Sequence, residues 1–180
     1  MDKYPNDPFM NRERVKDRLK SEYERYGKLI IAYDFDYTVH SYKDEDYTYE
    51  FVSNLLREWR PYSHLIVFSA SPESRFGYIK KYLDSKNIPY DTINSEVIER
   101  NYTRKIYYNV FLDDRAGLGE TAEILYEILE EIKSGKLVYK PKFVDYSYFG
   151  ELTKYEQKVV DCLRKDKVSD EDILKILKEL

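Results

Sequence analysis

An apolar run that ends in two carboxylates constrains this chain more than any other feature. The run is Leu-Ile-Ile-Ala-Tyr at residues 29–33, and Asp-Phe-Asp-Tyr-Thr follows it at residues 34–38. Consecutive apolar side chains predict a strand buried on both faces, as in a parallel sheet. Because side chains two residues apart in extended chain point the same way, we expect Asp34 and Asp36 to converge at its carboxyl end. Open α/β sheets bind their ligands at that end.

Polar side chains also follow two later apolar segments. Residues 65–68 lead into Ser69, and residues 109–112 lead into Asp113 and Asp114. A single acid after a strand most often caps a turn or a helix. Three strands that all end in such groups favour a functional site instead, because the carboxyl ends of parallel strands share one edge of the sheet.

Helical patterns separate these apolar segments. Apolar side chains recur at helical spacing in four stretches: 11–26, 48–59, 73–86 and 120–132. Gly27 and Pro61 are placed to end the first two. A short strand near 92–93 and a short helix over 95–100 complete the pattern. Strands that alternate with helices are typical of an α/β fold. We therefore expect a Rossmann-like, three-layer parallel sheet with helices on both faces.

The C-terminal region adds two more helical stretches. Residues 153–164 and 170–180 each carry one apolar stripe, and Ser169 and Asp172 have the spacing of a capping box for the second. This pattern predicts a core with an N-terminal helix and a short helical extension, residues 1–150 and 151–180. An apolar stripe must be covered, so we expect the extension to pack on the core or on a partner subunit of a homo-oligomer.

Composition narrows the setting in which the chain works. The net charge of −4 offers no general attraction for nucleic acid or an anionic membrane. No apolar run approaches the length of about 20 residues that a membrane span needs, and residues 1–14 contain no signal-peptide hydrophobic segment. The single cysteine, Cys162, excludes an internal disulfide and favours a reducing, cytoplasmic setting. His40 and His64 lack metal-ligand spacing and are interpreted as surface or edge side chains.

The clustered acids indicate a particular kind of chemistry. Carboxylates from two strands form the oxygen-rich ligand set that Mg²⁺ prefers. A dication beside a carboxylate neutralises a phosphate and lets that carboxylate attack phosphorus. A second carboxylate nearby can protonate the leaving alcohol and then activate water. The sequence therefore favours Mg²⁺-dependent phosphoryl transfer.

The order of these motifs resembles that of the haloacid dehalogenase-like superfamily of phosphatases. Residues 34–38 resemble its D-x-D-x-T motif. Residues 65–69 resemble its second motif, an apolar strand that ends in Ser or Thr, and residues 110–114 its fourth, an apolar strand that ends in paired acids. The resemblance covers roughly residues 28–132 and implies a phosphatase with a bound Mg²⁺.

The resemblance also implies a role for each matching residue. Asp34 is the nucleophile that becomes an aspartyl phosphate, and Asp36 is the general acid/base. Thr38 and Ser69 are assigned to phosphate binding, Thr38 by supporting the first loop. Four residues are assigned to the metal: Asp34, Asp36 through its backbone carbonyl, Asp113 and Asp114.

Other positions fit the family pattern less closely. Lys105, shortly before the acidic strand, is assigned as the phosphate-binding lysine, whereas Lys80 and Lys81 lie in a predicted helix and are interpreted as solvated. Tyr37 stands where many family members have glycine; its ring either packs on the loop or stacks on a substrate base. The predicted helices and strands fill the chain between the motifs, so we expect no cap domain.

Several functions stay open at this point. The leading hypothesis is a phosphomonoester hydrolase for nucleotides, sugar phosphates or phosphorylated macromolecules. A polynucleotide 3′-phosphatase is an alternative, because residues 104–105 (Arg-Lys) and 113–115 (Asp-Asp-Arg) are similar to those of polynucleotide kinase/phosphatases, although the net acidity opposes it. A non-catalytic phosphoacceptor resembling a response-regulator receiver is another, with its motifs in reverse order. A binding module that uses the C-terminal helices is a third. A dehalogenase has no need for the acid that Asp36 supplies.

Overall fold

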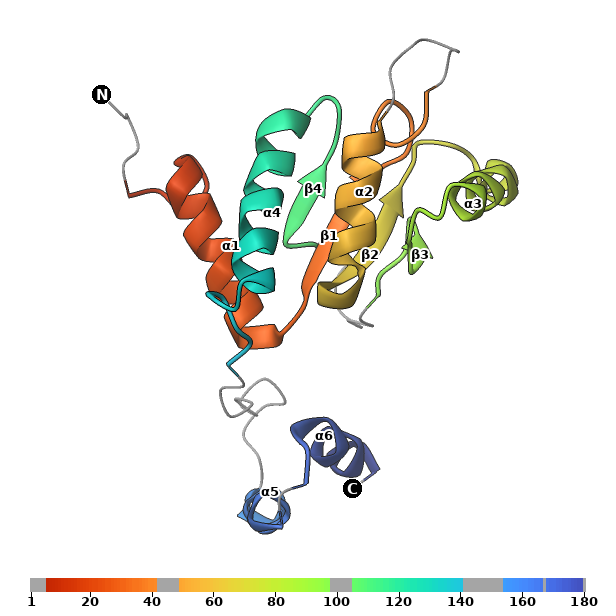
Figure 1. Cartoon of the computed structure of the whole chain (residues 1–180). Helices are drawn as coiled ribbons and strands as arrows, with labels where there is room; N and C mark the ends of the chain where they lie inside the picture. Colours follow the sequence, from red (N-terminus) through yellow and green to blue (C-terminus); the bar gives the residue numbers. More distant parts are fainter. Residues whose placement is uncertain (1–5, 42–48, 98–104, 141–153, 167, 180) are drawn as a thin grey trace. The chain divides into compact units, whose positions relative to one another are not determined.

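The chain divides into two compact units, residues 1–140 and 141–180 (Figure 1). The predicted boundary at residue 150 lies outside the described residues. The computed structural model describes residues 6–41, 49–97, 105–140, 154–166 and 168–179.

A four-stranded sheet forms the centre of the first unit. Its strands are β1 (Leu29–Asp34), β2 (Ser63–Phe68), β3 (Thr92–Ile93) and β4 (Val110–Leu112). They pair in parallel in the order β3-β2-β1-β4. Asp34 lies opposite Phe68, and Tyr33 lies opposite Leu112. The carboxyl ends of β1, β2 and β4 are therefore neighbours, as the sequence predicts, and the open parallel sheet of an α/β fold is confirmed.

Helices cover one face of this sheet. The described residues of the first unit form four α-helices: α1 (Arg12–Tyr26), α2 (Glu50–Trp59), α3 (Phe76–Ser85) and α4 (Leu118–Lys133). Figure 1 shows α2 in front of the sheet, with α4 and then α1 beside it. Leu29, Ile31 and Tyr33, alternate residues of β1, are buried in the main core with the apolar side chains of these helices. Trp59 is fully buried there and donates its indole N–H to the carbonyl of Leu125 at 3.2 Å.

Described residues between β3 and β4 lie on the opposite face. Right-handed crossovers from β1 to β2 and from β2 to β3 place α2 and α3 on one side of the sheet. Val97, Ile106 and Tyr108, between β3 and β4, pack against a smaller apolar cluster that includes Ile30 and Ile66. Helices were expected on both faces of the sheet, but the described residues of this second face, 94–97 and 105–109, form none. The predicted helix over 95–100 is absent at 95–97, and its remaining residues lie outside the described part of the chain.

The described residues of the second unit form two helices, α5 (Lys154–Lys165) and α6 (Asp170–Glu179). Val160 and Ile173 are buried together as the sequence pattern predicts. Ser169 accepts a hydrogen bond from the backbone N–H of Asp172 at 3.2 Å and donates to its carboxylate at 2.6 Å, which confirms the capping motif. Among the described residues of both units, no helix is long and apolar enough to cross a membrane.

Candidate active site

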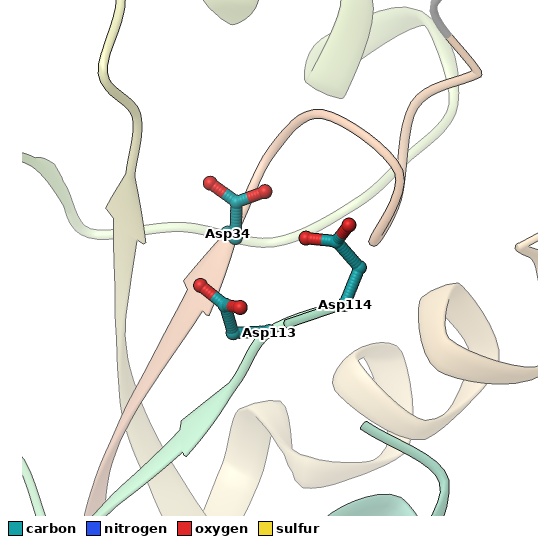
Figure 2. A group of neighbouring side chains, drawn as sticks. All are labelled: Asp34, Asp113 and Asp114. Carbon is teal, nitrogen blue, oxygen red and sulfur yellow. The ribbon is translucent and has the colours of Figure 1, made fainter. Parts of the chain in front are cut away.

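Three carboxylates gather at the carboxyl edge of the sheet. Asp34 is the last residue of β1, and Asp113 and Asp114 directly follow β4. One oxygen from each of the three lies within 4.8 Å of the others, and Figure 2 shows them at the ends of the two strands. Asp34 and Asp113 are half-buried, and Asp114 is exposed. This arrangement brings together three of the four residues that the sequence assigns to a metal.

The electrostatics of this group favour a bound cation. The pKa of Asp34 is raised to about 6, and burial is the largest cause. A hydrogen bond from the backbone of Phe35 lowers this pKa. The negative charges of three neighbouring acids raise it again: Asp113, Asp114 and Asp36. Each additional negative charge therefore makes the ionised state of Asp34 less favourable. A hard dication would reverse this effect, and a donor set made only of carboxylate oxygens suits Mg²⁺.

The side chain of Asp36 does not join this three-acid group. The strand β1 ends at Asp34, so the alternation of extended chain no longer applies two residues later. Asp36 instead faces Arg75, whose two terminal nitrogens lie 3.3 and 3.4 Å from its oxygens, and the ring of His40 at 3.3 Å. Asp36 lies close enough to Asp34 for its charge to raise the pKa of that acid, and its own carboxylate has a basic and aromatic setting beside the three-acid group.

His40 is part of the site rather than an edge side chain. It is 7% exposed and stacks on Phe35, with ring centroids 4.7 Å apart. Its Nε2 lies 2.9 Å from the hydroxyl of Tyr78, and its Nδ1 is the atom nearest Asp36. Burial lowers the pKa of His40, and the charge of Asp36 opposes that change. The neutral imidazole is thus favoured by its surroundings, and the buried ring lies against the carboxylate of Asp36.

The loop after β1 is a tight turn. The backbone N–H of Tyr37 bonds to the carbonyl of His40 at 2.8 Å, and that of His40 bonds back to Phe35 at 3.0 Å. Tyr37 has a φ of 62°, in the left-handed region that glycine adopts most easily. Tyrosine at this position therefore holds a backbone conformation that a glycine would adopt more easily.

Thr38 connects the two acidic loops. Its side chain is fully buried, and its hydroxyl accepts a hydrogen bond from the backbone N–H of Asp114 at 3.2 Å. The backbone N–H of Arg115 in turn bonds to a carboxylate oxygen of Asp113 at 2.7 Å. These contacts orient both acids after β4. The predicted support of the loop by Thr38 has a structural basis here, whereas direct contact with phosphate stays a prediction.

Ser69 is held at the end of β2 by Asn94. The side-chain oxygen of Asn94 accepts from the backbone N–H of Ser69 at 2.9 Å, and its amide donates to the carbonyl of Ser69 at 2.7 Å. The hydroxyl of Ser69 accepts from the backbone N–H of Ser71 at 3.1 Å. Asn94 belongs to no sequence motif; its signal is an asparagine directly after β3 with a φ of 48°, a conformation that asparagine tolerates.

Two basic side chains remain to be placed relative to the site, Arg75 and Lys105. Arg75 was missed because it belongs to no motif; it ends the short helix η2 (Glu73–Arg75) and reaches Asp36 through the tertiary fold. Lys105 is exposed at the start of the segment that leads into β4, and its role in phosphate binding stays a prediction. Lys80 and Lys81 are exposed on α3, in agreement with their interpretation as solvated.

Comparison with known proteins assigns this chain to no family. No family model matches the chain, and no curated protein is significantly similar to it. A solved structure of a conserved protein from Bacteroides thetaiotaomicron is similar, with 24% identity and a TM-score of 0.48, over 62% of this chain and 98% of that one. At these values the likeness carries no argument. The chain's own structure defines an α/β protein with an open parallel sheet and an acidic centre at its carboxyl edge.

Proposed function

We propose that this protein is a Mg²⁺-dependent phosphomonoester hydrolase of the haloacid dehalogenase-like type, in which Asp34 is the nucleophile. The observation that carries the proposal is the three-acid group at the ends of β1 and β4. Carboxylate oxygens this close to one another form a donor set that suits a hard dication. The motif order along the chain supports the same assignment.

The metal would be held by carboxylate oxygens of Asp34, Asp113 and Asp114. When bound, it supplies positive charge that neutralises the phosphoryl oxygens and screens the mutual repulsion of the acids. Half-burial of Asp34 and Asp113 strengthens these charge interactions relative to water. The hydrogen bonds from Arg115 to Asp113 and from Asp114 to Thr38 fix two of the ligands before any substrate binds.

The chemistry then needs two carboxylates with different tasks. An oxygen of Asp34 attacks phosphorus, the bond from phosphorus to the leaving oxygen breaks, and that oxygen takes a proton from Asp36. The product is an aspartyl phosphate on Asp34. Asp36 next accepts a proton from water, whose oxygen attacks phosphorus and breaks the bond to Asp34. Inorganic phosphate leaves, and both side chains return to their starting states.

Further residues would bind the transferring group. Ser69 stands at the end of the neighbouring strand with its backbone fixed by Asn94, so its hydroxyl is a suitable donor to a phosphoryl oxygen. Lys105 is proposed for the same purpose because an ammonium group binds phosphate as a point charge. Both side chains would stabilise charge that moves onto the phosphoryl oxygens.

The proposal is tested by phosphate release from para-nitrophenyl phosphate. We expect wild-type release to require Mg²⁺, to stop on addition of EDTA and to fall by about a thousandfold or more in Asp34→Asn and Asp113→Asn. Asp17→Asn, which changes an exposed acid on α1, is the matched control and should keep the wild-type rate. Equal rates in Asp34→Asn and wild type would contradict the proposal. Stable phosphorylation without turnover would instead favour the phosphoacceptor.

A further inference from the structure

The ion pair between Arg75 and Asp36 has longer contacts than is usual for an arginine and a carboxylate. Its two contacts are 3.3 and 3.4 Å long, whereas charge-assisted hydrogen bonds of this kind are typically about 2.7–2.9 Å. Arg75 makes its shorter bond to the hydroxyl of Ser71, at 2.9 Å. Both charged side chains keep contact with solvent, with exposed fractions of 28% and 27%. Such a pair stabilises the fold little and can exchange partners readily.

A second Arg–Asp pair in the same domain shows the contrast. Arg60 and Asp91 lie at 2.6 Å, and Asp91 also accepts a hydrogen bond from the backbone of Leu65 at 2.7 Å. That pair connects the start of β2 with the approach to β3, which is a structural task. Arg75 instead reaches across to a carboxylate that the proposed reaction uses, next to the loop that follows Ser69.

The present contacts of Asp36 engage both of its carboxylate oxygens. Arg75 faces both oxygens of the carboxylate, and His40 lies 3.3 Å from one of them. To protonate a leaving oxygen beside Asp34, Asp36 must turn an oxygen away from Arg75. An anion that draws the guanidinium off would allow this movement, and a planar guanidinium binds phosphate well because it offers paired donors.

We propose that Arg75 binds a second anionic group on the leaving group of the substrate and thereby releases Asp36 for proton transfer. This inference rests on the proposed hydrolase and names its substrate class: a phosphomonoester whose leaving group carries another phosphate. Tyr78 forms the exposed wall of this subsite. The guanidinium carbon of Arg75 lies 5.6 Å from the centre of the tyrosine ring, and Tyr78 is 49% exposed. Its hydroxyl bonds to His40, which keeps a support for Asp36 in place when Arg75 moves.

A pair of matched substrates tests the inference. We expect the wild type to prefer propane-1,3-diol bisphosphate over propyl phosphate by about tenfold or more in kcat/KM, beyond the statistical factor of about two for its two phosphates. Arg75→Ala should reduce the preference to that statistical factor, and Arg75→Lys should keep part of it. Arg60→Ala is the matched control and should show the wild-type preference. No preference in the wild type, or a full preference in Arg75→Ala, would overturn the inference.

A 3′-phosphorylated thymidine dinucleotide distinguishes two sources of the second phosphate. If it exceeds the bisphosphate in kcat/KM, and Arg75→Ala removes that advantage, the anion belongs to the end of a nucleic acid. If the bisphosphate is better and shows the same dependence on Arg75, the anion belongs to a small molecule. An advantage of either compound that survives in Arg75→Ala would contradict binding at Arg75.

A binding measurement separates this inference from the hydrolase proposal. Asp34→Asn protein with Mg²⁺ is titrated calorimetrically with the bisphosphate and with propyl phosphate. We expect about tenfold tighter binding of the bisphosphate, lost when Arg75→Ala is added and retained when Arg60→Ala is added instead. This result would support the Arg75 subsite even if the wild type failed to hydrolyse any monoester. Equal binding of the two compounds would overturn it, whatever the activity.

Discussion

The hydroxyl of Thr38 accepts a hydrogen bond from the backbone N–H of Asp114 at 3.2 Å, which joins the loop after β1 to the loop after β4. Thr38 is fully buried, so water cannot replace this bond. The contact fixes the two acidic loops relative to each other. The spacing between Asp34 and the acids after β4 therefore depends on a residue that touches neither the proposed metal nor the nucleophile.

Replacement of Thr38 by valine tests this connection. Valine keeps the shape but leaves the amide of Asp114 without its acceptor, so we expect the free energy of unfolding to fall by about 1–2 kcal/mol. We also expect the Mg²⁺ concentration for half-maximal activity to rise severalfold, because Asp114 is less well positioned. Thr38→Ser retains the hydroxyl and should recover most of the metal response. An unchanged response in Thr38→Val would show that the hydrogen bond does not position the acids.

Replacement of Asp34 by asparagine should stabilise the metal-free protein near neutral pH. The folded pKa of about 6 lies above the ordinary value of 3.8, so folding favours the protonated acid. The stability that this group contributes is present below about pH 4 and is lost as the pH rises through about 6. In EDTA at pH 7.5 we expect Asp34→Asn to gain about 1–2 kcal/mol, a figure reduced for solvent screening. The gain should disappear near pH 4, and denaturant unfolding at both pH values measures it.

Glu127 on α4 forms ion pairs with Arg12 and Lys16 on α1. These pairs predict that this part of the fold loses stability at low pH. Hydrogen bonds from Arg12, then Lys16, lower the pKa of Glu127 from 4.5 to about 2. Its stabilising contribution is therefore present above about pH 4.5 and is lost as the pH falls toward 2. Because the side chain is 38% exposed, Glu127→Gln should cost at most about 1 kcal/mol at pH 7. Glu13→Gln, at a more exposed acid, is the control; an equal loss in both variants would contradict a specific role.

The positive φ of Tyr37 predicts that a glycine variant at this position is more stable than a valine variant. Glycine adopts a φ of 62° without strain, whereas a β-branched residue there is a conformational outlier. Neither glycine nor valine retains the tyrosine ring, so comparing Tyr37→Gly with Tyr37→Val isolates the backbone effect. We expect the valine variant to be less stable than the glycine variant by about 1 kcal/mol or more in denaturant unfolding. The reverse order would show that this turn changes its conformation when the ring is removed.

The strands and the three-acid group were accessible from sequence because each follows from a local pattern. Residues 29–33 are apolar on both faces, and Asp34 and Asp113 directly end their strands, so parallel pairing alone brings them to one edge. The position of Asp36 was not accessible by the same rule. Strand geometry stops at Asp34, and a tight turn around Tyr37 redirects the chain.

The groups around Asp36 required the tertiary fold. Arg75 and Asn94 reach the site from η2 and from the end of β3, at distances along the chain that no motif connects. His40 has no metal-ligand spacing, and its burial against Phe35 and Tyr78 depends on how α3 packs. Periodicity predicts which face of an element is buried, but it does not predict which polar side chains meet across elements.

Covalent attack by Asp34 is the central step of the proposed mechanism, and trapping the aspartyl phosphate tests it most directly. Asp36→Asn should slow release of phosphate from Asp34, because the water that attacks phosphorus then lacks its base. The variant is mixed with para-nitrophenyl phosphate and Mg²⁺, quenched rapidly and treated with borohydride, which reduces an acyl phosphate to the alcohol. Peptide mass analysis should then find Asp34 converted to homoserine only when substrate and Mg²⁺ were both present. Continued phosphate release with Asp34 unmodified, or modification of a different carboxylate, would contradict the mechanism.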